Sequence, residues 1–343
     1  MSQNLPPPDQ LTSLPEGLFS VSKRPRRNRS TPAWRALATE NRLHTEQLVY
    51  PLFITEEKKI SPIRNLPGIS RLPLKALLKE IEEAASLGIK AVNLFAHVDK
   101  SKKDVIGSEA YHPGATLYTA IRAIKDEFPE MLVMADVALD PFTDHGLDGI
   151  LDEKGRVLND PTLVALAHMS LQAAEAGVDL ISPSDMMDGR VGFLRHVLDD
   201  FGFSHVGILS YAVKFASSLY APFRDALQST PQKGDKKTFQ VNPANSREAM
   251  LECSLDDHEG ADMLLIKPAM TSLDIIAKAR SQTPLPLGAY QVSGEYAMIK
   301  AAAEKGFLDE EKVLMESLLA IRRAGADFIF TYAAKQIARL LKP

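Results

Sequence analysis

The chain has 343 residues, of which 45% are hydrophobic and 24% are charged, and these values are typical of globular proteins. Its formal net charge of −4 argues against a general nucleic-acid binder. The single cysteine, Cys253, excludes an intrachain disulfide and a metal site built from thiolates. No run approaches the ~18 consecutive apolar residues that a membrane span needs. We therefore expect a cytoplasmic protein, with a plastid stroma as the alternative, and neither a membrane nor a nucleic-acid partner.

The N-terminal segment differs in composition from the rest of the chain. It begins with a proline-rich stretch that shows little hydrophobic periodicity, so residues 1–20 are expected to be a flexible leader. The basic cluster from Lys23 to Arg29 is either a solvated arm or an arm that grips a partner subunit, and it lacks the aromatic residues of a nucleic-acid patch. We predict a leader and basic arm over residues 1–45 and a folded domain over residues 46–343.

From Leu48 onward, apolar runs typical of buried strands alternate with segments of helical periodicity. The eight predicted strands are Val49–Ile54, Ala91–Phe95, Leu132–Leu139, Val178–Ser182, Val206–Tyr211, Met263–Ile266, Leu287–Val292 and Phe328–Thr331. The predicted helices are Leu74–Leu87, Ala115–Phe128, Pro161–Ala176, Val191–Phe201, one within Ser246–Gly260, Leu273–Ser281, Glu295–Lys305 and one after Thr331. This alternation predicts a (β/α)8 TIM barrel with an extended N-terminal arm.

Two lysines stand where strands of such a barrel end. The unbroken apolar run Met263–Ile266 stops at Lys267, and Pro268 prevents further strand pairing. Lys214 follows the apolar run Val206–Ala212 in the same way. Apolar surroundings and a neighbouring ammonium group favour a neutral amine, which attacks carbonyl groups and forms Schiff bases. The alternative is that each lysine merely marks the solvated end of its strand.

Carboxylates gather after the third and fourth predicted strands. Asp136, Asp140 and Asp148 follow the third strand, and Asp185 and Arg190 follow the fourth. Carboxylates suit hard cations such as Mg²⁺, and the alternative is a set of polar turns with a helix N-cap.

The segment of residues 221–245 is long and lacks a hydrophobic pattern. Loops of this length are uncommon unless they are functional, so we expect a lid over the active site. The segment carries Arg224 and Lys236, and cations on a lid are suited to clamp a carboxylate substrate.

The stretches Gly260–Asp274 and Val206–Asp225 closely resemble the porphobilinogen synthases, also called δ-aminolevulinic acid dehydratases, from about Arg24 to the C-terminal helix. The resemblance implies a lyase of tetrapyrrole (heme and chlorophyll) biosynthesis that condenses two 5-aminolevulinate molecules to porphobilinogen with loss of two waters. Lys267 and Lys214 then form the Schiff bases. By the same resemblance, the substrate-binding residues are Arg224, Lys236, Ser293, Tyr332, Asp136, Asp140 and Asp148.

The resemblance also carries expectations about metals and assembly. Zinc-dependent members have three cysteines at the positions of Ala138, Asp140 and Asp148, so we expect no catalytic zinc and place the chain in the aspartate-rich, Mg²⁺-type branch. The resemblance leaves open whether this branch uses Mg²⁺ or another hard cation, or works without a metal at the reacting site. Glu252 matches the position that ligates an allosteric Mg²⁺ at a subunit interface, with Asp185 and Arg190 nearby. No organic cofactor is expected. Because the family assembles through N-terminal arms, a homo-oligomer, commonly an octamer, is implied.

One residue departs from the family pattern, and two rival functions are open. The family usually has arginine where Lys236 stands, and lysine keeps the charge but loses the bidentate contact. A sugar-phosphate aldolase is a rival, but no glycine-rich phosphate loop follows strands seven and eight. A barrel that has lost catalysis and serves as a binding or assembly module is a second rival, and the retention of both lysines and the carboxylates speaks against it.

Overall fold

The computed structural model describes residues 21–232 and 234–342, and the described chain divides into two compact units with the border between Arg42 and Leu43. The first unit contains the 3-10 helix η2 (Pro25–Arg29) and the short helix α1 (Pro32–Leu37), and neither of these described elements buries a side chain. Subunit contact by residues 1–45 stays a prediction. The expected leader at residues 1–20 lies outside the described residues.

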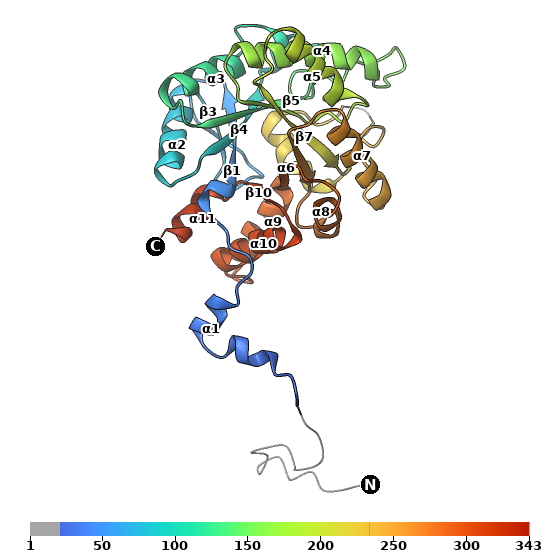
Figure 1. Cartoon of the computed structure of the whole chain (residues 1–343). Helices are drawn as coiled ribbons and strands as arrows, with labels where there is room; N and C mark the ends of the chain where they lie inside the picture. The colour runs from blue at the N-terminus through green and yellow to red at the C-terminus, as the bar shows by residue number, and fades with distance from the viewer. Residues whose placement is uncertain (1–20, 233, 343) are drawn as a thin grey trace. The chain divides into compact units, whose positions relative to one another are not determined.

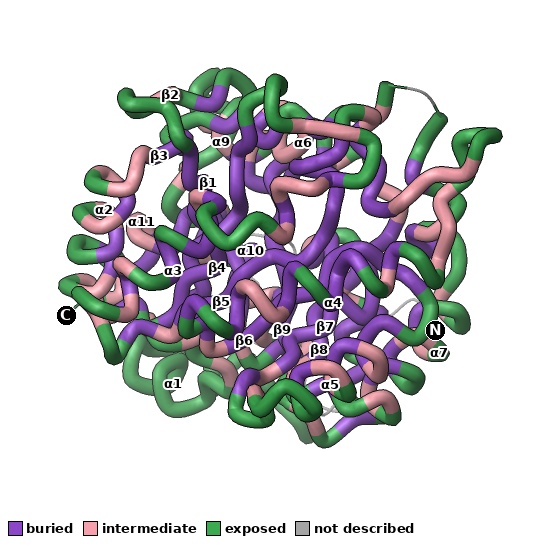
Figure 2. The backbone as a smooth tube through the Cα atoms, turned by 90° about the horizontal axis from the view of Figure 1, so that it is seen from above, coloured by how far each residue is buried: buried purple, intermediate pink, exposed green. Residues whose placement is uncertain are grey.

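Among the described residues, eight parallel strands close into a barrel in the order β1, β4, β5, β6, β7, β8, β9, β10, and β10 pairs back to β1. This confirms the predicted (β/α)8 TIM barrel. The strands are almost entirely buried, because helices cover their outer face and side chains fill the interior (Figure 2). Their bounds are β1 Leu48–Thr55, β4 Ala91–His97, β5 Leu132–Val137, β6 Leu180–Pro183, β7 Gly207–Lys214, β8 Met263–Lys267, β9 Leu287–Gln291 and β10 Phe328–Thr331.

The helices lie around the barrel and return the chain from the end of one strand to the start of the next (Figure 1). Helix α2 shows why they form, since Leu77, Ile81 and Ala84 recur on one face and are buried. Gly88, with a φ of 93°, follows its last turn, as predicted. The helix bounds are α2 Leu74–Ser86, α3 Thr116–Glu127, α4 Asn159–Glu175, α5 Arg190–Asp200, α7 Ser246–His258, α8 Leu273–Arg280, α9 Ser293–Glu304, α10 Glu310–Ala324 and α11 Ala334–Leu341.

Some elements are absent from the sequence prediction. Helix α10 lies where no helix is predicted, although Asp309 caps its first turn by accepting from the backbone N–H of Lys312. The short strand β3 pairs with the end of β1 and with β2, and the expected loop at residues 221–245 begins with helix α6. The bounds of these and the short 3-10 elements are β2 Ser61–Pro62, β3 Ser70–Leu72, α6 Ala221–Leu227, η3 Thr45–Gln47, η4 Lys100–Lys102, η5 Ser108–Tyr111 and η6 Ser218–Tyr220.

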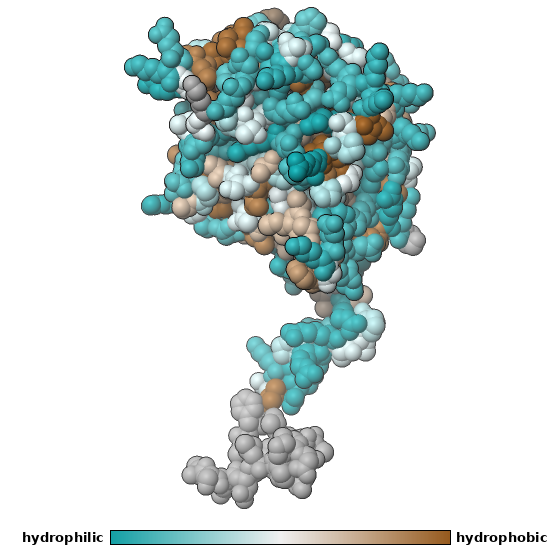
Figure 3. Space-filling model, turned by 180° about the vertical axis from the view of Figure 1, so that it is seen from behind, coloured by the Kyte–Doolittle hydropathy of each residue, from teal (hydrophilic) through white to brown (hydrophobic). Residues whose placement is uncertain are grey.

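Apolar side chains gather in the barrel wall and under the helices, where they form one connected core. The face of the barrel seen in Figure 3 is largely hydrophilic, with only small apolar patches. In the described part of the chain, no helix has both the length and the apolar character needed to cross a membrane.

Candidate active site

The two predicted catalytic lysines end adjacent strands of the barrel. Lys214 is the last residue of β7, Lys267 is the last residue of β8, and the two are register partners. The register shifts between Ser210 and Val213, so that β7 holds one extra residue there, and without this bulge Lys214 would be level with Pro268. The bulge therefore brings both amines to the same level at the catalytic end of the barrel, where both residues are buried.

Aromatic rings surround the amine of Lys267. Its Nζ lies 4.6 Å from the ring centroid of Tyr211, and the other distances are 5.1 Å to Tyr220, 5.4 Å to Tyr290 and 5.7 Å to Phe223. Burial, and after it the charge of the neighbouring strand-end lysine, lower the pKa of Lys267 well below its ordinary value, although nearby aspartates oppose the shift. The lowered pKa favours the neutral amine, which is the nucleophile in Schiff-base formation. Sequence reasoning did not single out these rings, because they come from separate segments of the chain.

Two other lysines of the site form ion pairs with aspartates. Lys236 Nζ lies 3.1 Å from Asp140 Oδ2 and 2.6 Å from Asp148 Oδ2. Lys214 Nζ lies 3.2 Å from Asp148 Oδ1 and donates to the carbonyl oxygen of Ser184. Burial alone would lower the pKa of Lys236, but the two carboxylates outweigh it and raise that pKa. Burial alone would raise the pKa of Asp140, but the charges of Lys236 and Lys214 hold it below its ordinary value.

Asp136, on β5, supplies an acid with different properties. Burial raises the pKa of Asp136 to about 7, because desolvation outweighs the attraction of Lys214 and Lys267. A carboxyl group with a pKa in this range accepts and releases protons near neutral pH. The structure thus brings the three predicted aspartates to the lysines and places them in different electrostatic environments.

The predicted lid covers the strand ends. Arg224, Lys236 and Gln240 of this segment line a cavity of about 20 Å³ together with the strand-end lysines, and this volume holds about one water molecule, so the described conformation, here called closed, has no room for substrate. Gly146 permits this closure, because a Cβ atom there would lie only 2.8 Å from the carbonyl oxygen of Thr230 in the lid. The cavity is lined by Asp140, Ser184, Lys214, Tyr220, Phe223, Arg224, Lys236, Gln240 and Lys267.

Ser293 and Tyr332, the predicted carboxylate-binding hydroxyls, are buried and bonded to protein groups. The Ser293 hydroxyl accepts from the backbone N–H of Phe223 at 3.1 Å and donates to the carbonyl oxygen of Leu219 at 3.3 Å. The Tyr332 hydroxyl accepts from the Tyr290 hydroxyl at 2.9 Å. Ser293 therefore holds the start of α6 in the closed conformation, and the substrate-binding roles of both hydroxyls stay predictions.

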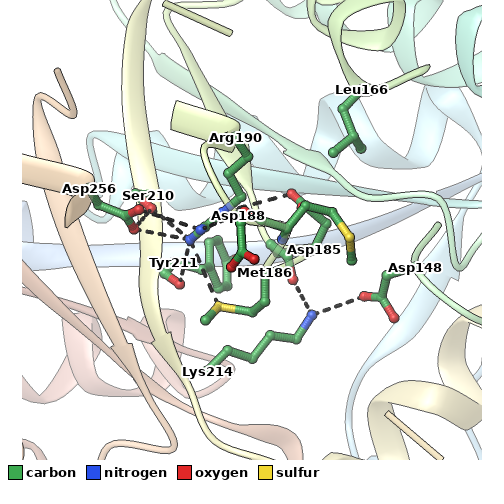
Figure 4. A network of polar contacts seen from close by, with 12 residues as sticks. Asp148, Leu166, Asp185, Met186, Asp188, Arg190, Ser210, Tyr211, Lys214 and Asp256 are labelled. Atoms are coloured by element: carbon green, nitrogen blue, oxygen red, sulfur yellow. Dashed lines mark hydrogen bonds and ion pairs between the residues drawn. The ribbon is translucent and has the colours of Figure 1, made fainter. Parts of the chain in front are cut away.

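A buried ionic network lies beside the lysine of β7 (Figure 4). Arg190, at the start of α5, is 1% exposed and lies 3.0 Å from Asp256 of α7 and 3.9 Å from Asp185. It also donates to Ser210 Oγ of β7 at 3.1 Å. Burial raises the pKa of Asp185 to about 6, although the charge of Arg190 opposes this shift. Sequence reasoning missed Asp256, since no local pattern marks a contact between residues on separate βα units.

Glu252 lines a larger cavity of about 680 Å³, whose lining includes neither Lys214 nor Lys267. The cavity is also lined by Asp188 and Glu248, whereas Asp185 and Arg190 belong to the buried network. Burial raises the pKa of Glu252, and the charge of Arg190 opposes this shift. The structure thus separates the predicted allosteric position from the reacting centre, with α7 carrying both Glu252 and the network residue Asp256.

A closed barrel that pairs two strand-end lysines, one of them with a lowered pKa among aromatic rings, defines a lyase of the Schiff-base class. The model of the family described as "Delta-aminolevulinic acid dehydratase" matches residues 22–340. The chain belongs to this family, as the resemblance in its sequence predicts, and this decides against the sugar-phosphate aldolase and the non-catalytic module.

Individual relatives agree with the family assignment. The chain is 51% identical over 322 residues to the chloroplastic delta-aminolevulinic acid dehydratase of Glycine max, covering 94% of this chain and 78% of the relative. The chloroplastic enzyme 1 of Arabidopsis thaliana is 49% identical, with 94% and 75% covered. The crystal structure of the Toxoplasma gondii enzyme in complex with the reaction product porphobilinogen has a TM-score of 0.92 and 50% identity, with 93% of this chain and 92% of that chain covered.

Proposed function

We propose that the chain condenses two 5-aminolevulinate molecules to porphobilinogen through Schiff bases on Lys267 and Lys214. The enzyme is a lyase of tetrapyrrole biosynthesis, and the family assignment supports this activity. The single observation that carries the Schiff-base roles is the register match of two buried lysines at the ends of β7 and β8, in the same closed cavity.

The reaction follows from the chemistry of amines and ketones. Each lysine amine attacks the ketone carbon of one substrate, and loss of the carbonyl oxygen as water leaves an imine, so two Schiff bases release the two waters of the overall reaction. The carbon next to one imine becomes acidic, loses a proton and attacks the other imine carbon, which joins the halves and leaves the second lysine attached as an amine. Loss of a further proton from the attacking carbon then expels that lysine and forms a carbon–carbon double bond. The amino group of one substrate attacks the remaining imine carbon, the other lysine leaves, and loss of a last proton gives the aromatic ring.

The charged groups of the cavity suit the remaining tasks. Asp136 has the pKa of about 7 that proton transfer at neutral pH requires. Arg224 lines the cavity and is available to hold a substrate carboxylate. Lys236 of the lid is paired with Asp140 and Asp148 in the closed conformation. When substrate binds, its ammonium group replaces Lys236 beside the aspartates and its carboxylate pairs with Lys236, which couples binding to lid movement.

Borohydride trapping tests the proposal. Reduction in the presence of 5-aminolevulinate is expected to leave covalent adducts on Lys267 and Lys214, and peptide mass spectrometry locates them. Parallel samples with EDTA and with added Mg²⁺ show whether a metal affects substrate capture. Absence of an adduct on Lys267 in both samples would contradict the mechanism.

We further propose that Mg²⁺ acts at Glu252 rather than at the reacting centre. At the reacting centre, Asp140 and Asp148 already neutralise Lys236. Within residues 21–232 and 234–342, no group of three or more His, Cys, Asp or Glu side chains is placed to hold a metal without water ligands, either at the reacting centre or around Glu252. Mg²⁺ keeps several waters and needs only one or two carboxylates, so Glu252, with Asp188 and Glu248 on the same cavity, fits a hydrated Mg²⁺.

Metal binding at this position is expected to be linked to assembly, because the resemblance places it at a subunit interface of a homo-octamer. Sedimentation velocity with Mg²⁺ and with EDTA measures the link, and E252Q is expected to give the same species in both conditions. An E252Q enzyme that responds to Mg²⁺ like the parent chain would place the ion elsewhere.

The relatives are named chloroplastic, and on this ground we propose a plastid location, whereas the cytoplasmic expectation is not confirmed. Imaging of the fluorescently tagged full-length chain distinguishes the two compartments.

A further inference from the structure

Two cations outside the reacting centre bind the last turn of α6. Arg71, on β3, donates from Nε to the carbonyl oxygen of Ala226 at 2.6 Å and from Nη2 to that of Asp225 at 2.8 Å. Lys103 donates from Nζ to the carbonyl oxygens of Leu227 at 3.1 Å and of Gln228 at 3.0 Å. Four consecutive carbonyl groups, from residue 225 to residue 228, are thus held by two side chains.

The chemistry of a helix C-terminus explains these contacts. The last carbonyl groups of a helix lack partners within the helix, and they carry a partial negative charge that attracts cations. In the described part of the chain, no ion pair includes Arg71 or Lys103, and the carbonyl groups of the helix end are their hydrogen-bonded negative partners, although the charge of Asp140 also acts on Lys103. Arg71 is 9% exposed and Lys103 is half-buried, so both cations are partly or largely removed from water, and burial lowers the pKa of Lys103.

Helix α6 carries active-site groups between its two fixed ends. Its Phe223 ring lies 5.7 Å from Lys267 Nζ, and Arg224 lines the closed cavity. Ser293 holds the beginning of the helix through the backbone N–H of Phe223. The cations hold its other end, so the position of the ring and the guanidinium group over the strand ends depends on both attachments.

We infer that Arg71 and Lys103 are positioning residues that fasten the C-terminal end of α6 and thereby hold Phe223 and Arg224 over Lys267. Since the closed cavity holds about one water molecule, α6 has to leave this position for substrate to enter. The two cations therefore set the balance between the open and the closed lid. This role of the two cations deepens the proposed function. Only its kinetic test, which uses 5-aminolevulinate, rests on that function.

Hydrogen–deuterium exchange of the substrate-free enzyme tests the attachment independently of catalysis. R71M and K103M are expected to speed amide exchange over residues 221–232 by about tenfold or more, because each variant loses two charge-assisted hydrogen bonds, with little change in the barrel strands. K103R is expected to restore much of the protection, because it keeps a cation at the helix end. The matched control is K102M, since Lys102 is exposed and pairs with Glu56 and Glu109 instead.

Kinetics with 5-aminolevulinate give the second readout. A weakened closed state is expected to raise KM about tenfold in R71M and K103M while kcat at saturating substrate stays within about threefold, because bound substrate drives the lid closed. Unchanged exchange over residues 221–232 in both variants would overturn the inference, as would a fall in kcat with KM unchanged. If the parent chain shows no borohydride adduct, the proposed function fails, whereas the exchange experiment still decides the role of the two cations.

Discussion

Replacing Lys267 with methionine is expected to abolish porphobilinogen formation, with a fall in kcat on the order of 10⁴-fold or more, as for removal of a covalent nucleophile in other enzymes. Methionine fills a similar volume among the aromatic rings but cannot form a Schiff base. An arginine at the same position keeps a charge and is expected to be equally inactive. The activity is measured as porphobilinogen released at saturating 5-aminolevulinate.

The stability of K267M separates a chemical from a structural role. A lysine whose pKa is lowered by folding destabilises the folded state at every pH below its unfolded value near 10.5, and removing it abolishes that cost. The melting temperature of K267M at neutral pH is therefore expected to equal or exceed that of the parent chain. K278M, in the exposed part of α8, is the matched control and is expected to keep full activity. Residual activity of K267M above about 1% of the parent value would show that Lys267 is not the essential nucleophile.

The second large effect is expected at Arg190. Its replacement by methionine leaves Asp256 and Asp185 buried without their counter-ion, and breaking a buried ion pair in this way costs about 3–5 kcal/mol of unfolding free energy. Chemical denaturation at pH 8 measures this cost. The matched control is R156M, because Arg156 is exposed and its pair with Asp152 is screened by water, so little change in stability is expected.

The pH dependence of R190M checks that charge is the cause. Without Arg190, the pKa of Asp185 rises above its value of about 6, so the folded state binds more protons than the unfolded state between the unfolded pKa near 3.8 and the raised folded pKa. Stability then increases as the pH falls, and the deficit of R190M is expected to be smaller at pH 5.5 than at pH 8. The double variant R190M/D256N is expected to recover much of the loss. An R190M protein as stable as the parent at pH 8 would show that the network does not depend on its charges.

Local signals in the sequence were sufficient to predict the barrel and to select Lys214 and Lys267 as the strand-end lysines. Apolar runs such as Met263–Ile266 and glycine-terminated helices such as α2 are confirmed, because strand and helix patterns depend on neighbouring residues. Helix α10 was predictable in the same way, since Asp309 and its inward-facing apolar residues form a local signal that the prediction did not use.

The sequence by itself determined the barrel, the family and the two strand-end lysines, because periodicity and motif are properties of short stretches. Only the tertiary structure decided which charges meet: Lys236 with Asp140 and Asp148, Arg190 with Asp256, and Arg71 with the end of α6. The bulge in β7 that aligns Lys214 with Lys267 also has no local signature. These contacts join residues far apart in the chain, and they exist only once the closed barrel and the closed lid have removed the side chains from water.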